Sequence, residues 1–288
     1  MRIGVIGLGA IGSVVAQRLR RGGLSPAVAA GRRDGLPEGQ YDLILLCTRT
    51  ADIESALGRA APLLAADGAV VCLQNGLPEE RAAKIVGPRR VLGAVIGWSA
   101  TKTAAGECLV TGKGKFTLGG DSPRLCDAAL ALSTVFPVRE TRNLAGARWS
   151  KLALNCALST LGAISGLSLG EMAARPEVRD LALQVIAEVV DVAREKGVRL
   201  ERVSGIRPDR LIALQRPLQH AAVWLAVRGR TRQRTGMIAL LKSGRPAGVE
   251  DLNALIDRPL NRRLVEMVQE IERGERKIDP RNLKEALS

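Results

Sequence analysis

A lysine and an asparagine one helical turn apart are the first residues in this sequence that could do chemistry. They are Lys151 and Asn155, in the stretch RWSKLALN that opens a long apolar segment. Residues four apart lie on the same face of an α-helix, so both side chains would share a face that is otherwise apolar. A lysine there can donate a proton to a developing oxyanion, and an asparagine can orient a substrate oxygen. The alternative is a surface lysine that buries its stem and keeps its ammonium in water.

The second chemical candidate is a glycine-rich turn near the N-terminus. GVIGLGAIG contains Gly-x-Gly-x-x-Gly directly after a short apolar strand and at the start of a helix pattern. Glycine allows a sharp turn and a close approach to a pyrophosphate, which the N–H groups at the helix start can bind. The alternative is a purely structural turn. We expect a dinucleotide held by Gly7, Leu8, Gly9, Ala10, Ile11 and Gly12.

Basic residues after the next two expected strands favour NADP over NAD. An NAD site has an acidic residue at the end of the second strand, where it accepts a hydrogen bond from the ribose 2′-OH. This chain has Gly31-Arg32-Arg33 there, with no carboxylate before Asp34. Arg32 can pair with a 2′-phosphate, and Arg49, at the end of LILLCTR, could reach the same end of the cofactor. The alternative is that these arginines are solvated loop charges.

Asn75, in the segment LQNG, ends another buried strand pattern. In an open parallel sheet, ligands lie beyond the carboxyl ends of the strands, so Asn75 could contact a ligand. Asn-Gly is also a common turn dipeptide, and both roles stay open at this point.

A parallel sheet followed by helices would position these residues. Strand and helix patterns alternate in the first half of the chain, whereas only helix periods follow from about residue 145. We therefore predict an α/β fold: a Rossmann-type doubly wound parallel sheet at 1–143 and an all-helical domain at 144–288. Within the first domain, GECLVTGKGKFTLGG is expected to form a β-hairpin.

The net charge of +14 raises the question of a nucleic-acid partner, because clustered basic residues neutralise phosphates. Only RGRTRQR is a dense basic cluster, and three Trp, one Tyr and two Phe are too few for a base-stacking platform. An arginine-rich surface with a pocket for an anionic cofactor explains the charge better. We expect no nucleic-acid partner.

Metal, membrane and export are likewise not expected. The five cysteines are scattered and the chain has one histidine, which does not match the ligand spacing of a zinc site. No apolar run approaches the length of a membrane span, and the N-terminus is too glycine-rich for a signal peptide. The expected location is the cytoplasm.

Residues 149–155 carry a Trp-x-Lys-Leu-x-x-Asn signature, and GLGAIG, LQNGLPEE and PLNRRLVEMV add less specific matches. In these segments, and over nearly its whole length, the chain resembles the ketopantoate reductase (2-dehydropantoate 2-reductase) family. The resemblance implies that Lys151 is the proton donor and that Asn155 binds substrate. It implies that Asn75 contacts cofactor and substrate, that Arg49 helps to hold the 2′-phosphate of NADPH, and that the helical domain serves substrate binding and homodimer formation.

Several polar positions of that family differ in this chain. Its second substrate asparagine is Ser159, and a further asparagine is Leu169. A family serine falls on Gly236, and a family glutamate falls on Gly248, with Glu250 two residues later. We predict that Ser159 and Glu250 contribute to substrate binding.

Three functions are compatible with these residues. The first is NADPH-dependent reduction of 2-dehydropantoate to pantoate, in pantothenate and coenzyme A biosynthesis. The second is reduction of another small 2-oxo acid on the same fold. The third is a nucleotide-binding regulator without turnover, which the retention of Lys151 and Asn155 disfavours.

Overall fold

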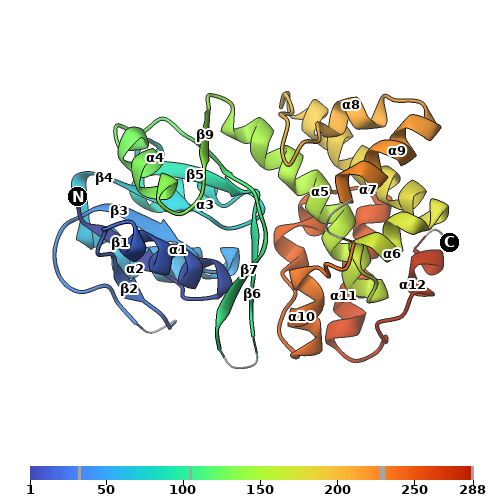
Figure 1. The fold of residues 1–288 in the computed structure, drawn as a ribbon, viewed down its shortest axis with the longest axis horizontal. Helices are drawn as coiled ribbons and strands as arrows, with labels where there is room; N and C mark the ends of the chain where they lie inside the picture. The colour runs from blue at the N-terminus through green and yellow to red at the C-terminus, as the bar shows by residue number, and fades with distance from the viewer. Residues whose placement is uncertain (32–33, 104–105, 228–230, 287–288) are drawn as a thin grey trace. The chain divides into compact units, whose positions relative to one another are not determined.

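A seven-stranded, mostly parallel sheet forms the centre of the first part of the chain (Figure 1). The strand order is β2-β1-β3-β4-β5-β8-β9, with only the β5–β8 pair antiparallel. The strands are β1 (Ile3–Ile6), β2 (Ala27–Ala29), β3 (Tyr41–Leu46), β4 (Leu64–Cys72), β5 (Val91–Ile96), β8 (Phe116–Gly119) and β9 (Val138–Thr141).

Helices cover both faces of this sheet. They are α1 (Ala10–Arg21), α2 (Ile53–Ala60), α3 (Glu79–Val86) and α4 (Leu125–Ser133), with short 3₁₀ turns at Thr50–Asp52, Ala61–Leu63 and Pro88–Arg90. Apolar residues of α1 and α4 share one hydrophobic cluster, and those of α2 and α3 share the other. Alternate residues of β3 enter the two clusters: Leu43 and Leu45 join the first, and Ile44 and Leu46 the second. Burial on both faces explains the unbroken apolar run of this strand.

The predicted hairpin of GECLVTGKGKFTLGG is wrong. Its first half, β7 (Cys108–Gly112), pairs antiparallel with β6 (Ser99–Lys102) in a separate two-stranded sheet. Its second half is β8, which joins the main sheet between β5 and β9. The two strands differ in burial. Phe116 and Leu118 of β8 are fully buried in the main sheet, whereas Leu109 of β7 is 50% exposed.

The second part of the chain is helical. Its helices are α5 (Leu144–Ser165), α6 (Leu169–Ala174), α7 (Pro176–Glu195), α8 (Pro208–Ile212), α9 (Arg216–Val227), α10 (Gly236–Lys242), α11 (Pro259–Glu272) and α12 (Asn282–Glu285), with 3₁₀ turns η4 (Val249–Asp251) and η5 (Asn253–Leu255). None of the helices in the described residues is both long and apolar enough to cross a membrane.

This computed structural model describes residues 1–31, 34–103, 106–227 and 231–286. The chain divides into two compact units, Met1–Leu144 and Ala145–Ser288. The α/β sheet unit and the helical unit confirm the predicted fold class.

Candidate functional site

Three parallel strands of the first unit end in register at one edge of the sheet. Ile6 of β1 pairs with Leu46 of β3, which pairs with Cys72 of β4. The glycine-rich turn follows β1 directly, and Arg49 and Asn75 lie three residues beyond the ends of β3 and β4. The strand order changes direction between β1 and β3, which is where open α/β sheets bind ligands. The sheet therefore brings these predicted cofactor residues to one edge.

The three glycines of the turn differ in what a side chain would meet. A Cβ added at Gly7, whose φ is +93°, would lie 2.8 Å from the backbone nitrogen of Thr48. A Cβ at Gly12 would lie 2.0 Å from the carbonyl oxygen of Gly7. A Cβ at Gly9 would have no described atom within 4 Å, and the φ of −71° at Gly9 is open to any residue. Internal packing thus explains Gly7 and Gly12, whereas Gly9 is exposed and open space lies beside it.

The start of α1 fits an anionic group in that space. Among the described residues no side chain caps this helix, and its first turn contains no acidic residue. The first N–H groups of a helix have no partner within it and carry partial positive charge. The neighbouring thiol of Cys47 adds no negative charge, because burial raises its pKa to about 12. A dinucleotide pyrophosphate fits the turn of Gly7 to Gly12, including Leu8, Ala10 and Ile11.

The residues predicted to select the cofactor are only partly described. Arg32 and Arg33 lie outside the described residues. Arg49 immediately precedes the 3₁₀ turn Thr50–Asp52, and its Nε lies 3.1 Å from Oδ2 of Asp52. The carboxylate of Asp34 accepts a 2.6 Å hydrogen bond from the N–H of Gly31, so an acidic group does lie just beyond β2. A 2′-phosphate at this edge would compete with Asp52 for Arg49.

The loops that carry Arg49 and Asn75 are joined by hydrogen bonds. The hydroxyl of Thr50 donates to the carbonyl oxygen of Asn75 over 3.2 Å, and the amide of Gln74 donates to the hydroxyl of Thr48 over 3.2 Å. The residue Asn75 itself is exposed. The carbonyl oxygen of Asn75 thus helps to join the two loops, and its exposed side chain is accessible for the predicted ligand contact.

Helix α5 has one partly exposed face in the second unit. Residues 146–165 are all described, and only Lys151, Asn155, Leu158 and Ser159 among them are not buried. Lys151, Asn155 and Ser159 are spaced four apart and lie on that one face. The thiol of neighbouring Cys156 is neutral, because burial raises its pKa. The structure thus brings the three α5 residues of the prediction together on the accessible strip of a helix that is otherwise core.

A buried polar network behind α5 was missed by the sequence analysis. Asn253, which is fully buried, accepts a 2.5 Å hydrogen bond from Thr160 and donates to the carbonyl oxygen of Cys156 at 3.1 Å. It also donates to Asn261 at 2.9 Å, and Asn261 in turn donates to Glu188 at 2.8 Å. The network joins α5, η5, α11 and α7. The only sequence signal for it is the presence of asparagines within apolar segments.

The remaining family positions lie in different surroundings. Leu169 is buried, and Gly236 is exposed at the start of α10. The residue before it, Thr235, donates its hydroxyl to the carbonyl oxygen of Ser159 at 3.2 Å. Gly248 adopts a left-handed conformation with φ of 80°. Leu169, where the family resemblance implies an asparagine, is thus part of the hydrophobic core. The hydroxyl of Thr235 lies next to Ser159.

Glu250 lies on the exposed side of η4. The hydrogen bond that the structure gives its carboxylate comes from Gln269 of α11, at 3.4 Å. This contact is with α11 and not with the α5 face, and the role of Glu250 in substrate binding stays a prediction.

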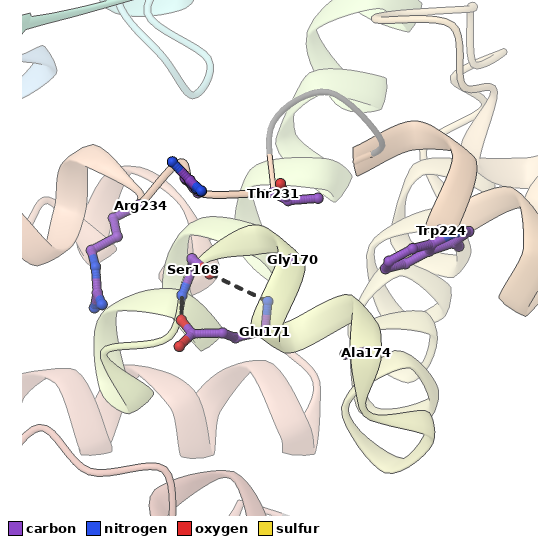
Figure 2. A pocket seen from close by; sticks show the side chains of 8 residues that line it. Ser168, Gly170, Glu171, Ala174, Trp224, Thr231 and Arg234 are labelled. Atoms are coloured by element: carbon purple, nitrogen blue, oxygen red, sulfur yellow. Dashed lines mark hydrogen bonds between the residues drawn. The ribbon is translucent and has the colours of Figure 1, made fainter.

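A hollow in the second unit is lined by none of the predicted site residues. Its volume is about 490 Å³, and it is lined by Ser168, Gly170, Glu171, Ala174, Trp224, Thr231, Arg232 and Arg234 (Figure 2). Ser168 and Glu171 in its wall form a capping box at the start of α6, so they stabilise the helix. Within the described ranges, no group of three His, Cys, Asp or Glu side chains could hold a metal ion.

Two family models match the sequence. The model described as ketopantoate reductase PanE/ApbA matches residues 24–122, and the model of the C-terminal part of the same family matches residues 143–272. The 2-dehydropantoate 2-reductase of Archaeoglobus fulgidus is 25% identical over 308 residues, which cover 95% of this chain and 98% of that protein.

Solved structures share the fold over nearly the whole chain. The PanE/ApbA family ketopantoate reductase of Ralstonia eutropha has a TM-score of 0.78 at 24% identity, covering 96% of this chain and 99% of that one. D-mandelate dehydrogenase, solved with NADH and anilino(oxo)acetate, has a TM-score of 0.80 at 19% identity, with coverage of 95% and 99%. A dimeric ketopantoate reductase from Staphylococcus aureus has a TM-score of 0.74 at 16% identity, with coverage of 96% and 100%.

Proposed function

Since this chain belongs to the ketopantoate reductase PanE/ApbA family and is an oxidoreductase, we propose that it reduces 2-dehydropantoate to pantoate with NADPH. The product would enter pantothenate and coenzyme A synthesis. The observation that carries the proposal is the accessible strip of α5, where Lys151, Asn155 and Ser159 are three of the four residues within 146–165 that are not buried. A strip of hydrogen-bonding groups on a core helix is suited to a small polar substrate.

In this proposal the protein supplies the proton and the orientation. When NADPH is bound, it supplies the hydride that reduces the ketone carbon. The Lys151 ammonium stabilises the negative charge that develops on the carbonyl oxygen and then donates a proton to it. Asn155 and Ser159 hydrogen-bond the substrate, and Asn75 and Glu250 are proposed as further substrate contacts. The substrate carboxylate is a second group that a lysine attracts.

The cofactor part of the proposal depends on Arg49 and Arg32. A guanidinium pairs with a 2′-phosphate but cannot accept a hydrogen bond from a 2′-OH. We expect NADPH to bind more tightly than NADH, by a margin that shrinks as salt rises. Replacing both arginines by alanine should remove most of this preference in fluorescence titrations. Equal affinities of the parent enzyme for the two cofactors at low salt would contradict the assignment, and Asp34 beside Gly31 would then be the group that selects NADH.

A second candidate substrate class is another 2-oxo acid. Leu169 and Gly236 lack the polar groups that the family resemblance implies, and Leu169 is part of the core. A protein of the same fold has been solved with anilino(oxo)acetate, which is larger and more apolar than 2-dehydropantoate. Initial rates with NADPH on 2-dehydropantoate and on a panel of linear, branched and aromatic 2-oxo acids would decide between them. The first proposal requires kcat/KM to be highest for 2-dehydropantoate.

We also propose that the enzyme works as a homodimer. The dimeric ketopantoate reductase of the same fold supports this assembly. Sedimentation velocity of the purified protein over a wide concentration range tests it.

A further inference from the structure

Helix α5 is held from behind its accessible strip by one buried amide. Asn253 of η5 is fully buried, and its side chain contacts two residues of α5. Its Oδ1 accepts a hydrogen bond from the hydroxyl of Thr160 at 2.5 Å, and its Nδ2 donates to the carbonyl oxygen of Cys156 at 3.1 Å. Cys156 and Thr160 are four residues apart, so a single amide spans one turn of the helix.

This contact takes the place of the one that a hydroxyl inside a helix usually makes. A serine or threonine there tends to donate to the carbonyl four residues earlier in its own helix. Ser165 of α5 does so, because its hydroxyl donates to the carbonyl oxygen of Leu161 at 2.6 Å. Thr160 donates to Asn253 instead, and the carbonyl of Cys156 accepts from Asn253. The turn 156–160 is therefore fixed to a residue outside α5.

A carboxylate at the far end of the network fixes the direction of each amide in it. Glu188 of α7 accepts hydrogen bonds from the backbone N–H groups of Leu260 and Asn261 and from the side-chain amide of Asn261. An ionised carboxylate can only accept, so Asn261 must turn its NH₂ group to Glu188 and its oxygen to Asn253. Asn253 must then turn its NH₂ group to Asn261 and its oxygen to Thr160. The network thus has one arrangement of donors and acceptors.

The fixed turn carries two of the side chains proposed to bind substrate. Asn155 and Ser159 immediately precede Cys156 and Thr160, and their side chains lie on the accessible strip. A rotation or shift of this turn would move both of them together. A misplacement of about 1 Å can cost about 100-fold in rate, so the support behind the turn matters for the reaction. Lys151 lies one turn earlier, outside the fixed turn.

We propose that Asn253 is a positioning residue, which fixes Asn155 and Ser159 for substrate binding. The inference rests on the proposed function, from which it takes the substrate contacts of these two side chains. It adds that groups behind α5, on η5, α11 and α7, determine how well those contacts are made. Since Lys151 lies outside the fixed turn, loss of the network weakens substrate binding more than it slows proton transfer.

The first test replaces Thr160 by valine, which keeps the shape of the side chain and removes the hydroxyl. Oδ1 of Asn253 then loses the donor that orients it. In Thr160→Val we expect KM for the parent enzyme's best 2-oxo acid to rise about 10-fold, with a smaller change in kcat and an unchanged Kd for NADPH. Thr160→Ser keeps the hydroxyl and should return KM close to the parent value.

Leu211→Ala is the control that separates positioning from a general loss of stability. Leu211 of α8 is 5% exposed, and truncating a buried leucine destabilises a protein at least as much as removing one buried hydrogen bond. Kinetics are measured well below the unfolding temperature of each variant. Leu211→Ala should keep the parent KM, and a rise equal to that of Thr160→Val would overturn the positioning role.

Glu188→Gln tests the far end of the network and does not require a folded Thr160→Val variant. A glutamine must place its NH₂ group against an N–H donor at the start of α11, so at least one contact of Glu188 is lost. KM should rise again, and the effects of Glu188→Gln and Thr160→Val should be less than additive in the double variant, because both act through Asn253. A folded Glu188→Gln enzyme with the parent KM, or fully additive effects, would overturn the inference.

Failure of this inference and failure of the proposed function are distinct results. A parent enzyme that reduces none of the 2-oxo acids in the panel overturns the proposed function, and the positioning role with it. A parent enzyme that turns over a 2-oxo acid, together with a folded Thr160→Val variant that keeps the parent KM, overturns only the positioning role.

Discussion

At the scale of single residues, substitutions in the turn of Gly7, Gly9 and Gly12 can distinguish a glycine needed for packing from one needed for cofactor binding. Gly12→Ala should destabilise the protein by several kcal/mol, because its Cβ would lie 2.0 Å from a backbone oxygen. Gly9→Ala meets no described atom and should leave the thermal unfolding midpoint unchanged. It should weaken NADPH binding by about 10-fold or more, since the new methyl group would enter the space in which we propose that the pyrophosphate binds. Unchanged NADPH affinity in Gly9→Ala would mean that the open space is not the cofactor site.

Lys151 gives the second prediction at this scale. Lys151→Ala should slow the chemical step by about 10²–10⁴-fold, the usual contribution of a general acid, while NADPH affinity stays the same. Asn155→Ala should mainly raise KM, because it removes a substrate contact but not the proton donor. Stopped-flow hydride transfer and cofactor titration separate the two effects. Lys242→Ala, at an exposed position at the end of α10, is the control and should be silent. A folded Lys151→Ala enzyme that reduces its substrate at the parent rate would show that Lys151 is a surface residue without a catalytic role.

At the scale of elements, sequence patterns predicted individual helices and strands better than they predicted which elements pack or pair with each other. The helix containing Lys151 and the strand–turn–helix of the glycine motif depend on spacing within one segment, which a sequence displays directly. The pairing of β7 with β6 instead of β8 depends on which apolar side chains find a buried position, and this is decided across the sheet. The Asn253 network was invisible for the same reason, because Asn253 and Thr160 are 93 residues apart.

The Asn253 network should contribute to the stability of the helical unit. Asn253→Leu would leave Thr160 and Asn261 buried without their present hydrogen-bond partner. Each such buried group costs about 1–3 kcal/mol, so for these two groups the free energy of unfolding measured in urea should fall by about 2–6 kcal/mol. Ala254→Leu, at the next and exposed residue of η5, is the control and should change it little. An Asn253→Leu variant as stable as the parent would show that the network adds no net stability.

The contact between α7 and α9 gives a prediction about pH. The hydrogen bond from Arg216 and then that of His220 hold the pKa of Asp180 below its usual value. A lowered pKa in the folded state means that Asp180 stabilises the fold above the unfolded pKa of about 3.9 and that this contribution is lost as pH falls further. Asp180→Asn should therefore lower stability at neutral pH, and its difference from the parent should vanish in acid. Urea unfolding of both proteins as a function of pH measures this; a difference in the free energy of unfolding that does not shrink as pH falls below about 3.9 would contradict it.

At the scale of the whole molecule, the division into two units has a thermodynamic consequence. Met1–Leu144 and Ala145–Ser288 are each compact, and the residues proposed to bind NADPH belong to the first. A ligand stabilises the state that binds it, by about 2.7 kcal/mol at 100 times its Kd. NADPH should therefore raise the unfolding temperature of the first unit more than that of the second. Calorimetry should resolve two transitions, and the transition of Met1–Leu144 should move further with NADPH than that of Ala145–Ser288.

Tryptophan fluorescence assigns these transitions to the units. Trp98 is buried in the first unit, where its ring stacks on that of Phe136 with the ring centroids 4.5 Å apart. Trp149 is buried in the second unit. In Trp149→Phe, Trp224→Phe the remaining signal reports the first unit, and in Trp98→Phe, Trp224→Phe it reports the second. We expect NADPH to shift the Trp98 transition and to leave the Trp149 transition within error, and Gly9→Ala should abolish the shift. Equal shifts at both tryptophans would mean that the chain unfolds as a single cooperative unit, because ligand binding then stabilises every part of it alike.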